Sequence, residues 1–175
     1  DADVMATLTR QKEAVLSQLG ELHGLVEAID RLMEAEMNDQ PATEADLKEV
    51  FGEGYSEEHM AEAEQRWGDT DAWRQSRART QRFTKDDWQQ VKQEAEAVNA
   101  AFVAALEAGL PATSEAAMDA AEQHRLSIHE RFYDCSHEFH RNLGDMYVAD
   151  PRFTQTYDAL TPGLAAYVRD AIHAN

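Results

Sequence analysis

The chain of 175 residues contains a single cysteine, Cys135, and lacks long apolar runs. One cysteine cannot form an internal disulfide, which favours a reducing compartment, so we expect a cytoplasmic protein. No stretch approaches the roughly 20 apolar residues that a membrane span needs, and the N-terminal segment lacks the basic flank and apolar stretch of a signal peptide. We therefore expect no membrane partner.

Positive charge is also scarce. The 16 lysines and arginines face 34 aspartates and glutamates, which leaves a formal net charge of −18. Such a negative field repels nucleic acid phosphates and anionic lipids, so this chain is not expected to contact DNA directly. Hydrophobic residues still make up 43% of the sequence, enough to bury a core.

Strand-like alternation is missing, whereas helical spacing runs through the whole chain, so we expect an all-α fold. The first 40 residues carry a heptad pattern that predicts a coiled-coil dimerisation helix and hence a homodimer. The alternative is a long helix lying on its own domain. The pattern begins without a cap, so we expect a piece of a longer protein. Its apolar positions are Leu8, Val15, Leu22 and Ile29, with Leu19, Val26 and Met33 four residues after the last three.

A domain boundary is expected near Pro41, because a proline stands there in a polar run. Residues 43–175 then form a second domain. Its first part, residues 43–82, is acidic, interrupted by glycines and limited to short helices, so we expect a mobile lid. Thr43 is expected to cap the first of these helices.

The helices after residue 83 are expected to be longer. Thr84 and Asp87 predict a capping box for a helix that ends at Gly109. Thr113 or Ser114 caps the next helix, and no glycine or proline interrupts the chain from there to Leu143. Further on, Thr161 is expected to cap the last helix, with Pro162 in its first turn.

No glycine-rich phosphate loop or nucleophile elbow occurs, and we find no catalytic set, so an enzyme is not expected. The histidines near Cys135 raise the question of a metal site. On one continuous helix from 115 to 143, His137 and His140 point away from the cysteine, while His124 lies about 16 Å along the axis. Zinc ligands must converge on one ion, so we expect no metal unless this helix breaks, and no cofactor.

Cys135 itself has two interpretations at this point. A lone cysteine usually behaves as a small buried apolar residue, and an apolar stripe on the helix would suit that role. Arg131, one turn away, would favour a thiolate, whereas Asp134 and Glu138 oppose it. The residues alone lean toward an inert cysteine.

Four segments of the second domain stand out in order and spacing: RWGDTDAWRQS (66–76), AMDAAEQHR (117–125), YDCSHE (133–138) and LGDMYVADPRFT (143–154). Together and in register they resemble the TipA-type (TipAS) antibiotic-recognition effector domain of MerR-class transcriptional regulators. The resemblance implies a globin-like helical ligand-binding domain for thiopeptide-type antibiotics. It also implies part of the dimerisation coiled coil, with DNA contacted only through a missing N-terminal domain.

The resemblance also implies a role for the cysteine. In this family the cysteine of a Tyr-Asp-Cys motif attacks a dehydroalanine of the antibiotic and forms a thioether. Cys135 stands at that position, after Tyr133 and Asp134. Such a protein is a stoichiometric trap and not an enzyme. Two alternatives stay open: a non-covalent drug-binding protein in which Cys135 only lines the cleft, and a coiled-coil interaction module.

Other residues are expected to contribute to the cleft. Large aromatic side chains suit a mostly apolar small-molecule site, and a few polar groups orient the ligand. We expect Asp119 or His124 to orient a polar, azole-rich ligand. The aromatic candidates besides Tyr133 are Trp67, Trp73, Phe132 and Tyr147.

Overall fold

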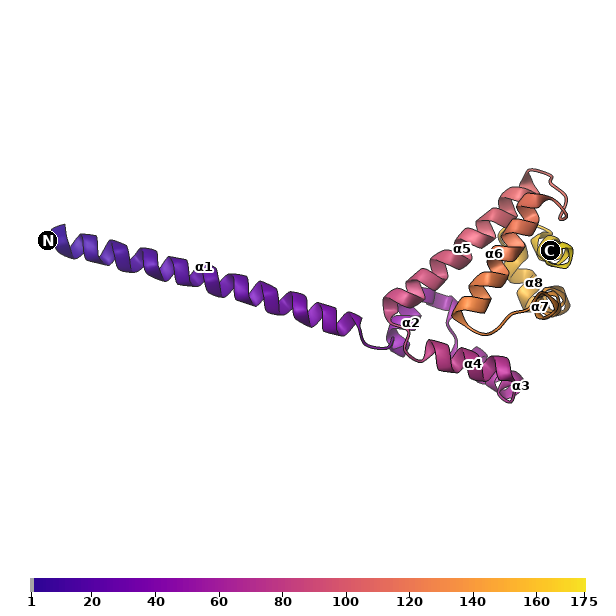
Figure 1. Cartoon of the computed structure of the whole chain (residues 1–175), viewed down its shortest axis with the longest axis horizontal. Coiled ribbons are helices and arrows are strands. Elements are labelled where there is room, and N and C mark those ends of the chain that lie inside the picture. The colour runs from indigo at the N-terminus through magenta and orange to yellow at the C-terminus, as the bar shows by residue number, and fades with distance from the viewer. Residues whose placement is uncertain (1) are drawn as a thin grey trace. The chain divides into compact units, whose positions relative to one another are not determined.

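The computed structural model describes residues 2–175, and within that range every regular element is a helix (Figure 1). This confirms the all-α prediction. The chain divides into two compact units, the first ending at Gln40 and the second running from Pro41 to Asn175. Among the described residues, no helix combines the length and the apolarity that crossing a membrane would require.

The first unit is α1, Ala2–Asn38, a helix of 37 residues. Its heptad positions form an apolar seam interrupted at Lys12, and this seam is exposed in the single chain. Leu8, Val15, Leu22 and Ile29 have exposed fractions of 53%, 54%, 58% and 54%. Exposure of an apolar row of this length to water is unfavourable, and a second helix packed against it would remove that exposure.

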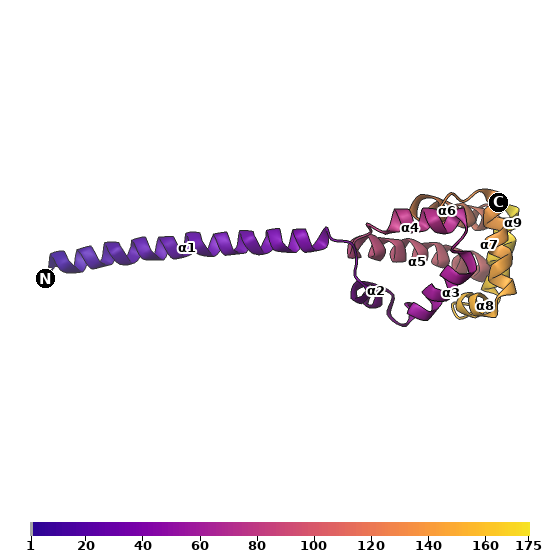
Figure 2. The same cartoon turned by 90° about the horizontal axis from the view of Figure 1, so that it is seen from below.

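The second unit is a helical domain whose two longest helices run beside each other in both views (Figures 1 and 2). Its elements are α2 (Glu44–Phe51), the short 3₁₀ helix η1 (Gly52–Gly54), α3 (Glu57–Trp67), α4 (Asp71–Thr80), α5 (Lys85–Glu107), α6 (Glu115–Arg131), α7 (His137–Ala149), α8 (Pro151–Asp158) and α9 (Leu164–Ala174).

Local sequence explains where most of these helices begin. Thr84 and Asp87 form the expected capping box of α5, and Thr43 forms a second box with Asp46 at the start of α2. Each box satisfies backbone N–H groups that a helix N-terminus leaves without partners. Of the two candidate caps for α6, Ser114 takes the role, because its side chain accepts the N–H of Ala117.

The core lies among α5, α6, α7 and α9. Phe102, Leu164 and Val168 have no exposed surface, and Ile172 is 2% exposed. Gly144 of α7 allows close approach to α9, because a Cβ atom built there would meet the Ile172 side chain at 3.4 Å. These contacts pack α5, α6, α7 and α9 into one hydrophobic core.

The helices α2 to α4 are packed differently. Neither α3 nor α4 contains a fully buried side chain, and Val50 is the buried residue of α2. Helices of 8 to 11 residues are marginal without tertiary support. This is consistent with weak intrinsic stability of residues 43–82, while their mobility remains a prediction.

The structure corrects the assumption of one helix from 115 to 143. The helix α6 ends at Arg131 and α7 begins at His137, with residues 132–136 as a loop between them. Ser136 caps α7 by accepting the N–H of Phe139, which competes with continuing α6. Cys135 is therefore not on a helix, and the expectation that Arg131 lies one helical turn away from it is wrong.

The predicted start of the last helix is also wrong. Thr161 does not cap α9, which begins at Leu164 after Gly163. Gly163 has φ +83°, a left-handed conformation that favours glycine over residues with a side chain. A tight turn at 161–163 thus precedes the helix and delays its first residue.

Candidate functional site

Cys135 lies in the loop of residues 132–136, here called the cysteine loop. Side chains of α6 bind both of its peptide groups. The Cys135 N–H donates to Nδ1 of His129 at 3.1 Å, and its carbonyl accepts from Nη1 of Arg125 at 2.7 Å. Arg125 is itself paired with Glu122 of the same helix, Nε to Oε2 at 2.9 Å. The last turns of α6 therefore fix the backbone of the cysteine.

The sulfur of Cys135 is buried, with only 1% of the residue exposed. Burial raises the pKa of the thiol to about 11, against the favourable charge of Arg125. A thiol must ionise and be accessible to act as a nucleophile. In this conformation burial both covers the sulfur and disfavours the thiolate.

A pocket of about 530 Å³ lies directly beside the cysteine loop. Four aromatic side chains contribute to it, and we call it the aromatic pocket. Tyr133 comes from the loop two residues before Cys135, and burial raises the pKa of its phenol to about 12, which keeps it protonated. Concave, mostly apolar surfaces with few polar groups are typical of small-molecule sites. Its lining comprises Ala63, Trp67, Thr70, Asp71, Ala72, Trp73, Ser76, Tyr133 and Phe139.

A second pocket, of about 670 Å³, lies beside Trp88, and we call it the Trp88 pocket. The indole has edge contacts with Phe51 and Phe83, at centroid distances of 5.9 and 5.2 Å. Trp73 and Ser76 of α4 line this pocket as well as the aromatic pocket. The helix α4 is thus a wall between two cavities.

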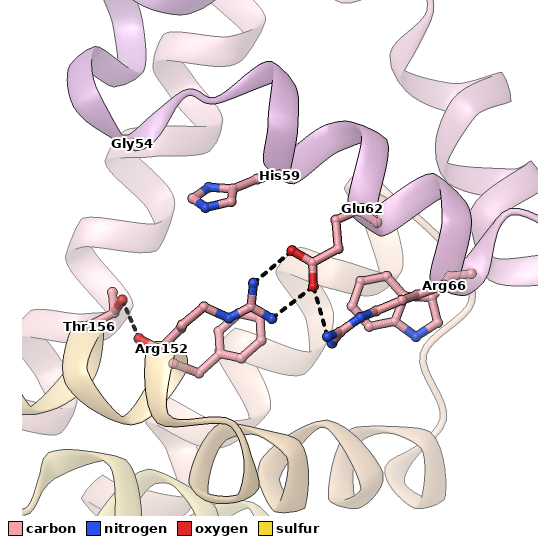
Figure 3. A pocket seen from close by; sticks show the side chains of 9 residues that line it. Gly54, His59, Glu62, Arg66, Arg152 and Thr156 are labelled. Atoms are coloured by element: carbon pink, nitrogen blue, oxygen red, sulfur yellow. Dashed lines mark hydrogen bonds and ion pairs between the residues drawn. The ribbon is translucent and has the colours of Figure 1, made fainter.

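A third pocket, of about 440 Å³, lies between α3 and α8 (Figure 3). Its charged groups pair with one another: the Glu62 carboxylate accepts from Arg152 at 2.8 and 3.2 Å and lies 2.8 Å from Arg66. Arg152 also holds the pKa of Asp150 down to about 2. Trp67 lines this pocket and the aromatic pocket alike, so α3 separates them.

The structure gathers only some of the residues that the sequence proposed for the site. Trp67, Trp73 and Tyr133 meet around the aromatic pocket. Asp134 is exposed and forms an ion pair with Arg79 of α4. Cys135 lies in the same loop but is covered.

The other candidates are elsewhere. Phe132 contacts Trp88, with ring centroids 6.3 Å apart. Tyr147 belongs to the buried core, and Asp119 is exposed on α6 away from the lining of the pockets described above. His124 packs against Phe102 inside the domain. None of these four touches the aromatic pocket.

Sequence reasoning missed several residues at the site. Phe139 lines the aromatic pocket, and its place follows from the Ser136 cap, a signal that the sequence contains. Arg125 and His129 support Cys135, and these contacts depend on the break between α6 and α7. Only a capping motif recognised at Ser136 would have indicated that break.

The break also changes the histidine geometry. His140 reaches back to His124, with Nδ1 of His124 2.8 Å from Nε2 of His140. The expectation that these residues stay apart assumed a continuous helix and is wrong. Desolvation lowers the pKa of both rings. The charges of Arg125 and His137 lower the pKa of His140 further, whereas Glu122 raises it. In the described part of the chain, no group of three histidine, cysteine or acidic side chains is placed to hold a metal ion.

A helical domain with an aromatic pocket beside a cysteine-bearing loop defines a small-molecule-binding domain. The chain belongs to the TipAS antibiotic-recognition domain family, whose sequence profile matches residues 59–175. This confirms the resemblance seen in the four sequence segments.

Similar proteins carry related names. The HTH-type transcriptional activator TipA of Streptomyces coelicolor is 47% identical over 174 residues, which cover 99% of this chain and 69% of that protein. The HTH-type transcriptional regulator SkgA of Caulobacter vibrioides is 28% identical over 98% of this chain and 69% of that protein. The solved structure of TipAS from Streptomyces lividans with nosiheptide, a thiopeptide antibiotic, matches with TM-score 0.69 and 50% identity. That match covers 77% of this chain and 94% of the other.

Proposed function

We propose that this chain is the effector-binding part of a MerR-class transcriptional regulator that senses and sequesters thiopeptide-type antibiotics. The observation that carries the proposal is the aromatic pocket, which shares Tyr133 with the loop that contains Cys135. The nosiheptide complex of the similar TipAS structure supports the ligand class. Trp67, Trp73 and Tyr133 supply aromatic surface for such a ligand.

The proposed covalent step is a conjugate addition. The Cys135 thiol loses its proton, and the sulfur forms a bond to the terminal carbon of a dehydroalanine in the antibiotic. The electron pair of the alkene moves to the adjacent carbon, which takes up a proton, so there is no leaving group. The step consumes the cysteine once, which makes the protein a trap and not an enzyme. Positioning by the pocket supplies the rate advantage.

The exposed seam of α1 supports a homodimer through residues 1–40. A second copy would cover apolar side chains that the single chain leaves in water. DNA recognition in the parent regulator belongs to a separate domain outside this chain, because a net charge of −18 opposes contact with phosphates. A regulator of this kind acts in the cytoplasm.

Residues 43–82 serve as a lid over the ligand. They bring Trp67 and Trp73 to the aromatic pocket, although α3 and α4 have no fully buried side chain of their own. A ligand that fills the pocket would supply the apolar contacts that these helices lack. Ordering of the lid would then couple binding to the dimerisation helix.

Intact-protein mass spectrometry after mixing with a thiopeptide tests the covalent step. We expect a mass increase equal to one antibiotic per chain. The alternative is a protein that binds the antibiotic without a covalent bond, and the burial of Cys135 supports it. Binding of the ligand without a mass increase would establish this alternative. A coiled-coil interaction module is the conclusion if residues 43–175 alone bind no thiopeptide.

A further inference from the structure

Four charged side chains form a closed ring of ion pairs between α3 and the start of α8. The Glu62 carboxylate accepts from both terminal nitrogens of Arg152, at 2.8 and 3.2 Å, and pairs with Arg66 at 2.8 Å (Figure 3). Asp150, directly before α8, accepts from Arg152 at 2.7 Å and lies 3.8 Å from Arg66. Each carboxylate therefore contacts both arginines.

The ring divides between the proposed lid and the rest of the domain. Glu62 and Arg66 are one turn apart on α3, which places them on one face of that helix. Asp150 accepts both the backbone N–H of Arg152, at 3.0 Å, and its Nε, at 3.1 Å, so these two residues are paired whether or not the lid is docked. An acid of the lid meets a base of the body, and a base of the lid meets an acid of the body. Only one register of α3 satisfies all four groups.

Apolar packing does not account for the docking of α3 at this edge. A cavity of about 440 Å³ remains between α3 and α8, and α3 has no fully buried side chain. Single exposed ion pairs contribute little to stability, whereas a bidentate pair within a network contributes more. The side chains of Asp150 and Glu62 are only 18% and 35% exposed, so solvent ions screen them incompletely. At this edge, α3 and α8 are therefore joined by charged groups across a cavity.

The same ring bears on the position of Trp67, the residue that follows Arg66 and ends α3. Trp67 lines both the cavity between α3 and α8 and the aromatic pocket. Because the indole moves with its helix, a shift of α3 away from α8 would withdraw it from the aromatic pocket. A ligand there would lose one of its aromatic surfaces.

We propose that Glu62 and Arg152 are positioning residues that dock α3 on α8 in one register and thereby place Trp67 in the ligand site. In the free protein the lid exchanges between undocked and docked positions, because the ring alone is weak. A ligand in the aromatic pocket shifts this equilibrium toward the docked position. The inference rests on the proposed function, since it names the contacts that dock the proposed lid.

Docking is measured without any antibiotic from the fluorine NMR signal of Trp67 in protein labelled with 5-fluorotryptophan. Trp67→Phe identifies the signal by its loss, and loss of docking moves the signal toward its position in the urea-unfolded chain. Glu62→Gln and Arg152→Gln should each lower the ratio of docked to undocked lid about threefold, the effect of one ion pair in a network. The double variant should fall short of the product of the two effects, because both substitutions remove the same contact.

Variants of opposite sign separate specific pairing from net charge. Arg66→Gln makes the chain more negative and Glu62→Gln makes it less negative, yet both break the ring and should lower docking. They also carry the test if Arg152→Gln does not fold. Glu64→Gln removes an acid from an exposed position of the same helix and should leave docking unchanged. Sodium chloride at about 1 M, where the Debye length is about 3 Å, should reduce docking more in the wild type than in the double variant.

The proposal is overturned if neither Glu62→Gln nor Arg66→Gln lowers docking, if Glu64→Gln lowers it equally, or if the wild type shows no docked lid at low salt. These outcomes are independent of the antibiotic. With a thiopeptide, Glu62→Gln should raise the Kd by up to about threefold, since fewer molecules have the docked lid. A thiopeptide that does not bind at all contradicts the proposed function and leaves the docking result as it stands, so the two failures are distinguishable.

Discussion

Nδ1 of His124 lies 2.8 Å from Nε2 of His140, and His140 is 1% exposed. Desolvation lowers the pKa of both rings, so the folded state holds them neutral. The other ring nitrogen of His140, Nδ1, is buried and has no hydrogen-bond partner among the described residues. In the folded state this pair therefore resists protonation, whereas in the unfolded chain both histidines can be protonated.

This pair predicts acid sensitivity at mild pH. Above about pH 6.5 both the folded and the unfolded chain keep these histidines neutral, and their contribution to stability is complete. As the pH falls below 6.5, the unfolded chain binds protons that the folded chain does not. The free energy of unfolding should decrease by up to about 1.4 kcal/mol per pH unit for each histidine. Urea unfolding at pH 7.5, 6.5 and 5.5 measures this slope.

His140→Gln should reduce the slope, since glutamine does not titrate. Equal slopes in the wild type and His140→Gln would contradict the prediction.

Cys135→Ser should abolish the covalent mass increase with a thiopeptide and leave reversible binding. The serine hydroxyl is a far weaker nucleophile, whereas the contacts of Trp67, Trp73 and Tyr133 with the ligand remain. Mass spectrometry measures the adduct, and tryptophan fluorescence titration measures reversible binding. An adduct that forms equally on the serine variant would place the bond at another residue.

The heptad seam predicts a dimer at tens of micromolar protein. Each fully buried apolar side chain contributes about 1.5–3 kcal/mol before the entropy of association is subtracted, so a seam of several such residues is sufficient. Sedimentation velocity should show a dimer for the full chain and a monomer for residues 43–175. A monomeric full chain under these conditions would exclude the coiled-coil dimer.

The lid prediction concerns residues 43–82 without ligand. Their helices lack fully buried side chains apart from Val50, so their amides should exchange much faster than those of residues 88–106 in α5. Addition of a thiopeptide should slow exchange in the lid. Equal protection of the two segments in the free protein would mean that the lid is preformed and that ordering is not the signal.

The sequence by itself was enough for those features that depend on neighbouring residues. The helical periodicity indicated an all-α chain, and the spacing from Thr84 to Asp87 indicated the start of α5, because a capping box involves residues three apart. Four segments in register, residues 66–76, 117–125, 133–138 and 143–154, were together sufficient to indicate the family.

Only the tertiary structure decided how the cysteine is held. The N–H of Asp134 donates to the side chain of Gln75, 59 residues earlier, and Arg79 of α4 donates to the carboxylate of Asp134 in the same loop. These partners come together only after α4 packs beside α6, so no local pattern could indicate them. The burial of Cys135 and the meeting of His124 with His140 follow from the same break at residues 132–136. Helical periodicity describes a side chain's direction on a continuous helix, and it loses that meaning across a break, where only packing decides which side chains of the two helices meet.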